Sequence, residues 1–278
     1  MKPVRSRDFI PINMKKRFLY ILGIFLVILL IVPFSVMAQD TEAFKKEHYI
    51  KDADTLKYRI LFPKDFSKNK KYPIVLFLHG AGERGNDNES QLIHGSSLFL
   101  ENRENFPAIV IFPQAPKDDY WAKVKVNRDT IPFQFDFENE KPATKSLQLV
   151  MDLMEDMLRK NFVDTSRIYV GGISMGGMGT YEIIYKKPAM FAAAFAICGG
   201  ANPEIATAYP KGFNIWIFHG EKDDVVLPKY SKIMAREINH HGGNAKLSLY
   251  PNDNHNSWDS ALAEPYLLPW LFSHERSE

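Results

Sequence analysis

Residues 170–179, VGGISMGGMG, decide the fold, because they set one serine, Ser174, among five glycines. The residues before the serine, RIYVGG at 167–172, form a short apolar run that predicts a buried strand. Residues 175–188 have the pattern of a helix that a proline ends. Residues 172–176 therefore fit G-x-S-x-G between a strand and a helix, where a sharp turn lifts a serine hydroxyl above a sheet. The alternative is a glycine-rich turn that serves packing alone.

Predicted strands and helices alternate on both sides of this turn. Helices are expected at 144–162 and 229–243, in addition to the one after Ser174. Further apolar runs predict strands at 58–62 (an edge strand), 72–80, 108–114, 191–200, 214–220 and 246–251. Such alternation predicts a single α/β domain, with a mostly parallel sheet and helices on both of its faces.

The first 38 residues differ from the rest of the chain. A basic start and a long apolar run precede Val36 and Ala38, which occupy the −3 and −1 positions of a cleavage site. This pattern predicts a secretory signal peptide at 1–38, with Met14 as an alternative start, and a secreted or periplasmic domain at 39–278. An uncleaved membrane anchor is the alternative, because the run is nearly long enough to span a bilayer.

Charge and cysteine content argue against a nucleic-acid-binding protein and against a fold held together by disulfides. The formal net charge is +2, but residues 1–38 carry six of the 35 basic residues and one of the 33 acidic ones. The remaining chain is thus net acidic, and no nucleic-acid partner is expected. We also expect no membrane contact after cleavage, and no pattern specifies an oligomeric state. The single cysteine, Cys198, precludes an internal disulfide and is expected to be a small buried hydrophobe.

Two loops after Ser174 carry the residue types that activate a serine. A serine nucleophile needs a histidine base, which a carboxylate orients, and the order along such chains is serine, acid, histidine. The segment IFHGEKDDVV contains Asp223 and its rival Asp224, and the segment LYPNDNHNSWD contains His255. We predict Ser174 as nucleophile, Asp223 as orienting acid and His255 as base. His219, at the end of its strand, is expected to form structural hydrogen bonds.

An oxyanion hole is expected close to the serine. One donor is the backbone N–H of Met175, the residue after the nucleophile. The second is assigned to Ala81, in the HGAG stretch that follows the strand at 72–80. His79 is expected to brace this loop, and Glu83 is expected to pair with Arg84 to make the loop rigid, the alternative being that both are solvated.

Residues 115–143 interrupt the alternation. They show no clear periodicity and are rich in aromatic and charged residues. This irregular insertion follows the strand at 108–114, at the sheet edge where α/β folds bind ligands. Within it, Trp121 is a candidate to stack on a sugar or a phenolic acyl group, as is Trp258 beside His255. The alternative for both is ordinary packing.

Four motifs together carry a resemblance to a known family. LHGAGERG, DTSRIYVGGISMGGMGT, HGEKDDVV and YPNDNHNSWD occur in order between residues 78 and 259. The chain resembles the α/β-hydrolase esterases, most closely the secreted branch with feruloyl esterases, acetyl xylan esterases and polyhydroxybutyrate depolymerases. The resemblance implies an α/β-hydrolase fold, a triad of Ser174, Asp223 and His255, and Met175 as an oxyanion donor. It does not fix the substrate.

These observations predict a secreted serine carboxylesterase without metal or cofactor. The expected substrate is a small-molecule, oligosaccharide or polysaccharide ester with a feruloyl or acetyl group. One alternative is a serine peptidase of the prolyl-oligopeptidase type, which usually has a large additional domain that this chain lacks. A second alternative is a non-catalytic binding protein on a hydrolase scaffold, which the presence of all three triad residues disfavours.

Overall fold

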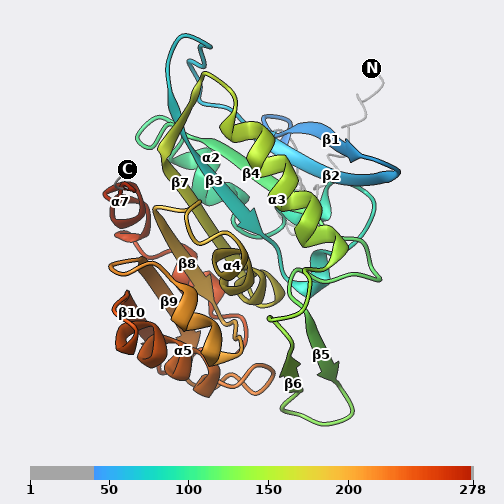
Figure 1. Ribbon diagram of the computed structural model, residues 1–278, viewed down its shortest axis with the longest axis vertical. Helices are drawn as coiled ribbons and strands as arrows, with labels where there is room; N and C mark the ends of the chain where they lie inside the picture. Colours follow the sequence, from blue (N-terminus) through green and yellow to red (C-terminus); the bar gives the residue numbers. More distant parts are fainter. Residues whose placement is uncertain (1–40, 277–278) are drawn as a thin grey trace, which may run out of the picture. The chain divides into compact units, whose positions relative to one another are not determined.

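An eight-stranded sheet organises the computed structural model, which describes residues 41–276 (Figure 1). The order across the sheet is β1-β2-β4-β3-β7-β8-β9-β10. All neighbours from β4 to β10 are parallel, whereas β2 is antiparallel to both β1 and β4. The strands are β1 (Lys45–Lys51), β2 (Asp54–Leu61), β3 (Tyr72–Leu78), β4 (Ile109–Gln114), β7 (Val163–Ile173), β8 (Ala193–Ile197), β9 (Asn214–Gly220) and β10 (Asn244–Tyr250).

The α/β class predicted from the sequence is confirmed, with one correction at the edge of the sheet. The strand expected at the edge, 58–62, belongs to β2, which lies between β1 and β4. The edge strand is β1, which the sequence analysis missed. Six of its seven residues are exposed, so it lacks the alternating apolar pattern that marks a half-buried strand.

Helices cover both faces of the sheet. Figure 1 shows α3, α4 and α5 in front of the strands, and α2 lies behind them. Side chains of β3 face both layers: Leu76 and Leu78 pack in the main core with α3, whereas Phe77 faces Phe99 of α2, with ring centroids 6.1 Å apart. The helices are α2 (Ser96–Glu101), α3 (Lys145–Leu158), α4 (Met175–Lys186), α5 (Lys229–His240), α6 (Trp258–Leu262) and α7 (Leu267–Phe272), with 3-10 turns η1 (Ala81–Glu83), η2 (Ser90–Leu92) and η3 (Pro203–Ala208).

The predicted signal peptide at 1–38 lies outside the described residues. From residue 41 to residue 276, no helix has both the length and the apolar composition that crossing a membrane requires.

The insertion at 115–143 is more regular than expected. It contains a separate antiparallel pair, β5 (Val124–Asn127) and β6 (Gln134–Phe137), called here the hairpin. Both strands alternate apolar and polar residues, VKVN and QFDF, but each is only four residues long. Runs this short do not rise above the surrounding charged sequence, which explains why the sequence predicted an irregular segment.

Candidate active site

Ser174 occupies the turn between β7 and α4. Its backbone has φ 51° and ψ −112°, a conformation that residues with a side chain rarely adopt. Its N–H donates to the carbonyl oxygen of Ile197 in β8 at 2.8 Å, which holds the turn against the sheet. Strain of this kind costs on the order of 1–3 kcal/mol and is concentrated at functional sites. The turn has the geometry of a nucleophile elbow.

The glycines around the serine allow backbone segments to approach closely. A Cβ on Gly176 would lie 1.9 Å from the carbonyl oxygen of Leu78, and one on Gly172 would lie 2.5 Å from Gly176 itself. A Cβ on Gly177 would lie 2.7 Å from the carbonyl oxygen of Ile197. The two interpretations of the glycine-rich turn therefore coincide: tight packing of α4 on the ends of β3 and β8 is what places the serine at this elbow.

The structure brings Ser174 together with the two residues predicted to activate it. Ser174 Oγ lies 2.9 Å from His255 Nε2, and His255 Nδ1 lies 2.8 Å from Asp223 Oδ2. With its proton on Nδ1, the imidazole donates to the carboxylate and accepts from the hydroxyl. This arrangement can remove a proton from Ser174 while a carboxylate steadies the resulting imidazolium.

Asp223 is buried, and hydrogen bonds keep it ionised. Burial by itself would raise the pKa of this carboxyl, but hydrogen bonds from His219 and His255 outweigh it and lower the pKa to about 2. The backbone N–H groups of Val225 and Val226 both donate to Oδ1 at 2.9 Å. The rival acid, Asp224, is exposed, and it is Asp223 that contacts the histidine.

His219 forms structural hydrogen bonds, as expected. Its Nε2 lies 3.0 Å from Asp223 Oδ2 and 2.7 Å from the carbonyl oxygen of Val226, so this nitrogen must carry a proton. Its Nδ1 lies 2.7 Å from the hydroxyl of Ser231. His219 thus fixes the same carboxyl oxygen that His255 contacts.

The residues assigned to the oxyanion hole lie beside the serine. Met175 is the first residue of α4, and the N–H groups of the first turn of a helix have no partner within it. Ala81 begins η1 and lines the same cleft as Ser174 and His255.

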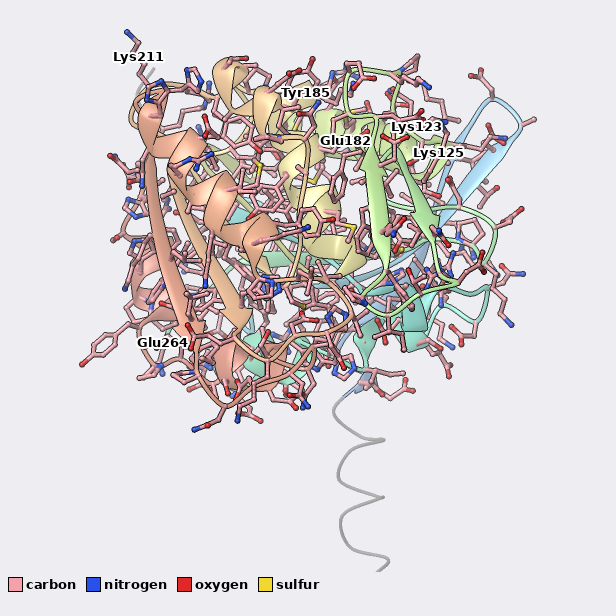
Figure 2. All side chains as sticks on the ribbon, turned by 90° about the horizontal axis from the view of Figure 1, so that it is seen from below. Lys123, Lys125, Glu182, Tyr185, Lys211 and Glu264 are labelled. Atoms are coloured by element: carbon pink, nitrogen blue, oxygen red, sulfur yellow. The ribbon has the colours of Figure 1, made fainter. Side chains whose placement is uncertain are left out.

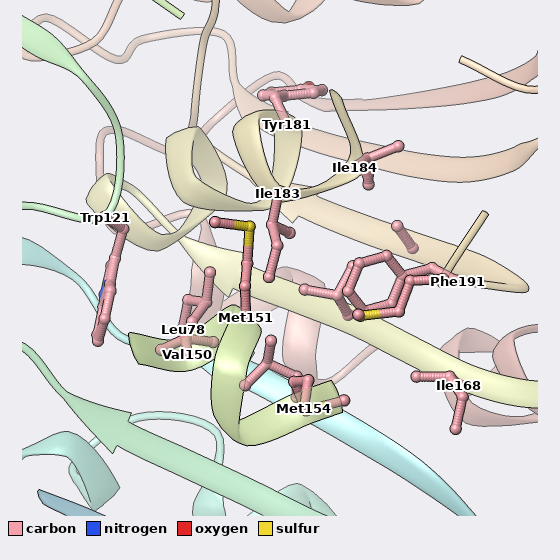
Figure 3. Close-up of a cluster of buried hydrophobic side chains, with 14 of the residues drawn as sticks. Leu78, Trp121, Val150, Met151, Met154, Ile168, Tyr181, Ile183, Ile184 and Phe191 are labelled. Carbon is pink, nitrogen blue, oxygen red and sulfur yellow. The ribbon is translucent and has the colours of Figure 1, made fainter. Parts of the chain in front are cut away.

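Trp121 does not contact the cleft, which corrects its predicted role in substrate binding. It is fully buried, with 0% exposure, and lies among core side chains such as Leu78 and Val150 (Figure 3). Its indole N–H donates to the carbonyl oxygen of His79 at 3.1 Å. The large apolar ring therefore supports the HGAG loop from within the core.

His79 fixes the same loop, as expected. Its Nδ1 lies 2.6 Å from the carbonyl oxygen of Gly80, and its Nε2 accepts from the N–H of Ala115 at 3.1 Å. Burial lowers its pKa to about 4, so the ring is neutral at ordinary pH.

The expected pair between Glu83 and Arg84 is not formed among the described residues. The Arg84 guanidinium instead donates to the carbonyl oxygens of Ala81, Lys117 and Asp119. Arg84 therefore makes the loop rigid through backbone oxygens, for which a planar guanidinium with five donors is well suited.

Ser174 and His255 line a cleft of about 250 Å³. Trp258 also lines it, and its ring lies edge-on to His255 with centroids 5.5 Å apart. A larger cavity of about 480 Å³ between α2 and α7 does not contain Ser174, so we assign the smaller cleft to the chemistry. Four further lining residues come from the insertion and were not predicted from the sequence: Tyr120, Arg128, Phe133 and Phe135. The aromatic content of that segment was their only signal.

One group of side chains has the spacing of metal ligands. Ligand atoms of Cys198, Asp223 and His255 all lie within 4.8 Å of one another. Burial raises the pKa of the Cys198 thiol, which disfavours the thiolate that a metal would need. Asp223 Oδ2 and His255 Nδ1 are already engaged with each other, so the arrangement fits a buried thiol beside a catalytic triad better than a metal centre.

A mostly parallel sheet and a serine at a strained strand-to-helix turn define an α/β-hydrolase when the serine is hydrogen-bonded to a histidine and the histidine to an aspartate. Residues 66–265 match the family model for phospholipase/carboxylesterase (Abhydrolase_2). The chain belongs to this family.

Three similar proteins are esterases or lipase-like by name. The bifunctional acetylxylan esterase/xylanase XynS20E of Neocallimastix patriciarum is 30% identical over 154 residues, which are 55% of this chain and 20% of that protein. Lysophospholipase-like protein 1 of Mus musculus is 26% identical over 72% of this chain and 85% of its own length. The crystal structure of a thermostable esterase has a TM-score of 0.76 and 32% identity, covering 86% of this chain and 64% of that one.

A peptidase is also similar to this chain. Dipeptidyl-peptidase 5 of Porphyromonas gingivalis is 28% identical over 179 residues, 61% of this chain and 24% of the peptidase. This chain thus spans only a fifth to a quarter of the length of the peptidase and of XynS20E.

Proposed function

We propose that this protein is a serine hydrolase of carboxylic esters that works through an acyl-enzyme. The observation that carries the proposal is the unbroken series from Ser174 Oγ to His255 to Asp223, with contacts of 2.9 and 2.8 Å. The family, whose description includes carboxylesterase, supports the same reaction.

The reaction begins when Ser174 Oγ bonds to the ester carbon and its proton passes to His255 Nε2. The carbonyl electrons move onto oxygen, where the N–H groups of Met175 and Ala81 stabilise the charge, each by roughly 3–4 kcal/mol. The C–O bond to the alcohol then breaks, and His255 returns its proton to the leaving oxygen. Water, deprotonated by the same nitrogen, then attacks the acyl carbon. The bond to Ser174 Oγ breaks, His255 returns its proton to that oxygen, and the acid is released. Asp223 remains ionised throughout.

For the substrate, we propose acetyl or feruloyl esters on a polysaccharide or oligosaccharide. Two observations support this choice: the name of XynS20E includes acetylxylan esterase, and aromatic side chains line the cleft beside Ser174. Phenylalanine and tryptophan faces suit both phenolic rings and the apolar faces of sugars.

Hydrolysis assays with p-nitrophenyl acetate, methyl ferulate and acetylated xylan test the proposal. We expect the purified protein to hydrolyse them and Ser174→Ala to lower kcat by about 10³-fold or more. If Ser174→Ala keeps more than a few per cent of the activity, the assignment of the nucleophile is wrong. A peptide p-nitroanilide tests the second candidate, a peptidase, which the similarity to dipeptidyl-peptidase 5 favours.

We also propose that the protein acts outside the cytoplasm after cleavage behind Ala38. The basic start, the apolar run and the small residues at the −3 and −1 positions support this. N-terminal sequencing of the protein from its native cells is expected to begin at Gln39, and a retained N-terminus would contradict cleavage.

A further inference from the structure

The open end of the hairpin is attached to α4, the helix that begins directly after Ser174. Glu182 Oε2 accepts two hydrogen bonds of 2.7 Å, one from the backbone N–H of Lys123 and one from the side-chain amide of Asn139. Lys123 immediately precedes β5, and Asn139 comes two residues after β6. Figure 2 shows Glu182 next to Lys123 at this end of the hairpin. One carboxyl oxygen thus links the start of β5 and the end of β6 to the helix.

Lys186 adds a second attachment one turn further along α4. Its ammonium donates to the carbonyl oxygens of Asn139 and Lys141, both at 2.6 Å. Glu182 accepts from hairpin donors, and Lys186 donates to hairpin acceptors. Because the two residues are four apart, they lie on the same face of the helix, and together they fix the orientation of the hairpin as well as its position.

The carboxyl of Glu182 is an unusual group to find at this position. Glu182 and Asn139 are both fully buried, with 0% exposure, and within residues 41–276 the other oxygen, Oε1, has no hydrogen-bond partner. Burial raises the pKa of Glu182 to about 7, although the hydrogen bonds and the nearby charges of Lys123 and Lys186 lower it. A buried carboxyl with one unpartnered oxygen is a poor way to stabilise a fold. What this carboxyl provides is one oxygen, Oε2, that accepts hydrogen bonds from residues flanking both strands of the hairpin.

The other part of the hairpin forms a wall of the catalytic cleft. Phe133 and Phe135 line the cleft with Ser174 and His255. The N–H of Phe133 donates to the carbonyl oxygen of Val225 at 3.3 Å, two residues after the triad aspartate. The hairpin therefore connects the helix after the nucleophile with the loop that holds the acid.

We propose that Glu182 is a positioning residue that determines substrate selectivity. By holding the open end of the hairpin on α4, it fixes Phe133 and Phe135 as the wall against which an aromatic acyl group packs. An acetyl group has no ring to pack against this wall, so its hydrolysis is expected not to depend on the wall. The inference rests on the proposed ester hydrolysis and adds that aromatic acyl esters are the substrates for which the hairpin is needed.

The test compares Glu182→Ala with Glu182→Gln on p-nitrophenyl acetate and methyl ferulate. Alanine removes the acceptor, so we expect KM for the ferulate to rise about tenfold while kcat/KM for the acetate stays within about twofold. Glutamine keeps an oxygen that accepts both hydrogen bonds and places its NH₂ where the unpartnered oxygen lies. It should therefore restore the wild-type ratio of kcat/KM for methyl ferulate to kcat/KM for p-nitrophenyl acetate. Asn139→Ala, which removes one of the two bonds, gives an intermediate ratio and serves if Glu182→Ala does not fold.

The matched control is Glu104→Ala, which removes an exposed glutamate paired with Lys64 outside the cleft. It should leave both esters unaffected. An equal loss of activity on ferulate and acetate in Glu182→Ala would overturn the inference, because a general structural role predicts it. Unchanged kinetics on both esters would also overturn it, because they would mean that Glu182 has no role. Failure of the proposed function is distinct: the wild type would then show no Ser174-dependent hydrolysis of either ester, and the inference would fall with it.

Discussion

Each oxygen of the Asp223 carboxylate has a separate task. Oδ1 receives two backbone N–H groups and holds the shape of its own loop. Oδ2 receives the two imidazoles of His219 and His255. All four contacts come from donors, so an ionised carboxylate is the group that satisfies them. Catalytic orientation and loop stability therefore depend on the same side chain.

Asp223→Asn is expected to impair both properties. An amide supplies one oxygen and one NH₂, so a donor must face either the two N–H groups or the two imidazoles. We expect kcat to fall by about 10⁴-fold, because His255 is no longer held with its proton on Nδ1. We expect a loss of roughly 1–3 kcal/mol in the free energy of unfolding for the unsatisfied contacts.

Ester kinetics and urea unfolding measure the two effects in the same samples. Asp224→Asn is the matched control, because it makes the same change at the exposed neighbour and should leave both values close to wild type. The opposite ranking of the two variants would show that the acid was assigned to the wrong residue.

The proximity of Ser174, Asp223 and His255 could be predicted from the sequence. Each residue follows a strand of the parallel part of the sheet, and such strands end at the same edge. It was not sufficient for the aromatic residues of the cleft. Trp121 and Tyr120 are adjacent, yet one supports the core and the other lines the cleft. Which of two neighbouring rings faces the solvent depends on the backbone conformation of an irregular segment, and the sequence of that segment has no periodicity from which this conformation could be predicted.

At the scale of elements, the contact between α4 and the end of β3 places the active site. Gly176 is where the helix backbone passes the carbonyl of Leu78, and the next residues of the chain after Leu78 form the loop that contains Ala81. The same contact therefore brings the nucleophile and the expected oxyanion donors to one point. Any side chain at Gly176 would separate them.

Gly176→Ala is expected to lower the free energy of unfolding by about 3 kcal/mol or more, because the added methyl would lie 1.9 Å from a backbone oxygen that cannot move aside. Thermal unfolding measures the effect. Gly82→Ala is the control for stability, since a Cβ there meets nothing within 4 Å. If both variants unfold at the temperature of the wild type, the close approach is not a constraint.

The strands that the sequence did not predict are those without a buried face. β1 is exposed along most of its length, and the hairpin pairs only with itself. Apolar periodicity reports burial, so strands that are held by backbone hydrogen bonds or by a remote carboxyl leave little trace in it. The role of Glu182 was not predictable either, because the sequence shows only a single glutamate within a predicted helix.

Two buried groups make the stability of the whole molecule depend on pH in opposite directions. Burial lowers the pKa of His79 from 6.5 to about 4, so the unfolded chain binds more protons between these values and stability decreases as the pH falls through them. Burial raises the pKa of Glu182 from 4.5 to about 7, so the folded protein keeps a proton that the unfolded chain releases. Its contribution therefore decreases as the pH rises from 4.5 to about 7.

Between about pH 5 and 6.5 the two slopes oppose each other, and Glu182→Gln removes one of them. We expect the free energy of unfolding of this variant to rise with pH more steeply than that of the wild type, by up to about 1.4 kcal/mol per pH unit. Urea unfolding at several pH values in this range measures the slope, with Glu104→Gln as the control. Parallel curves for wild type and Glu182→Gln would contradict a buried, protonated Glu182. Because glutamine keeps the acceptor oxygen, the slope should change while ester selectivity does not: the hairpin depends on the oxygen of this side chain, and the pH response depends on its proton.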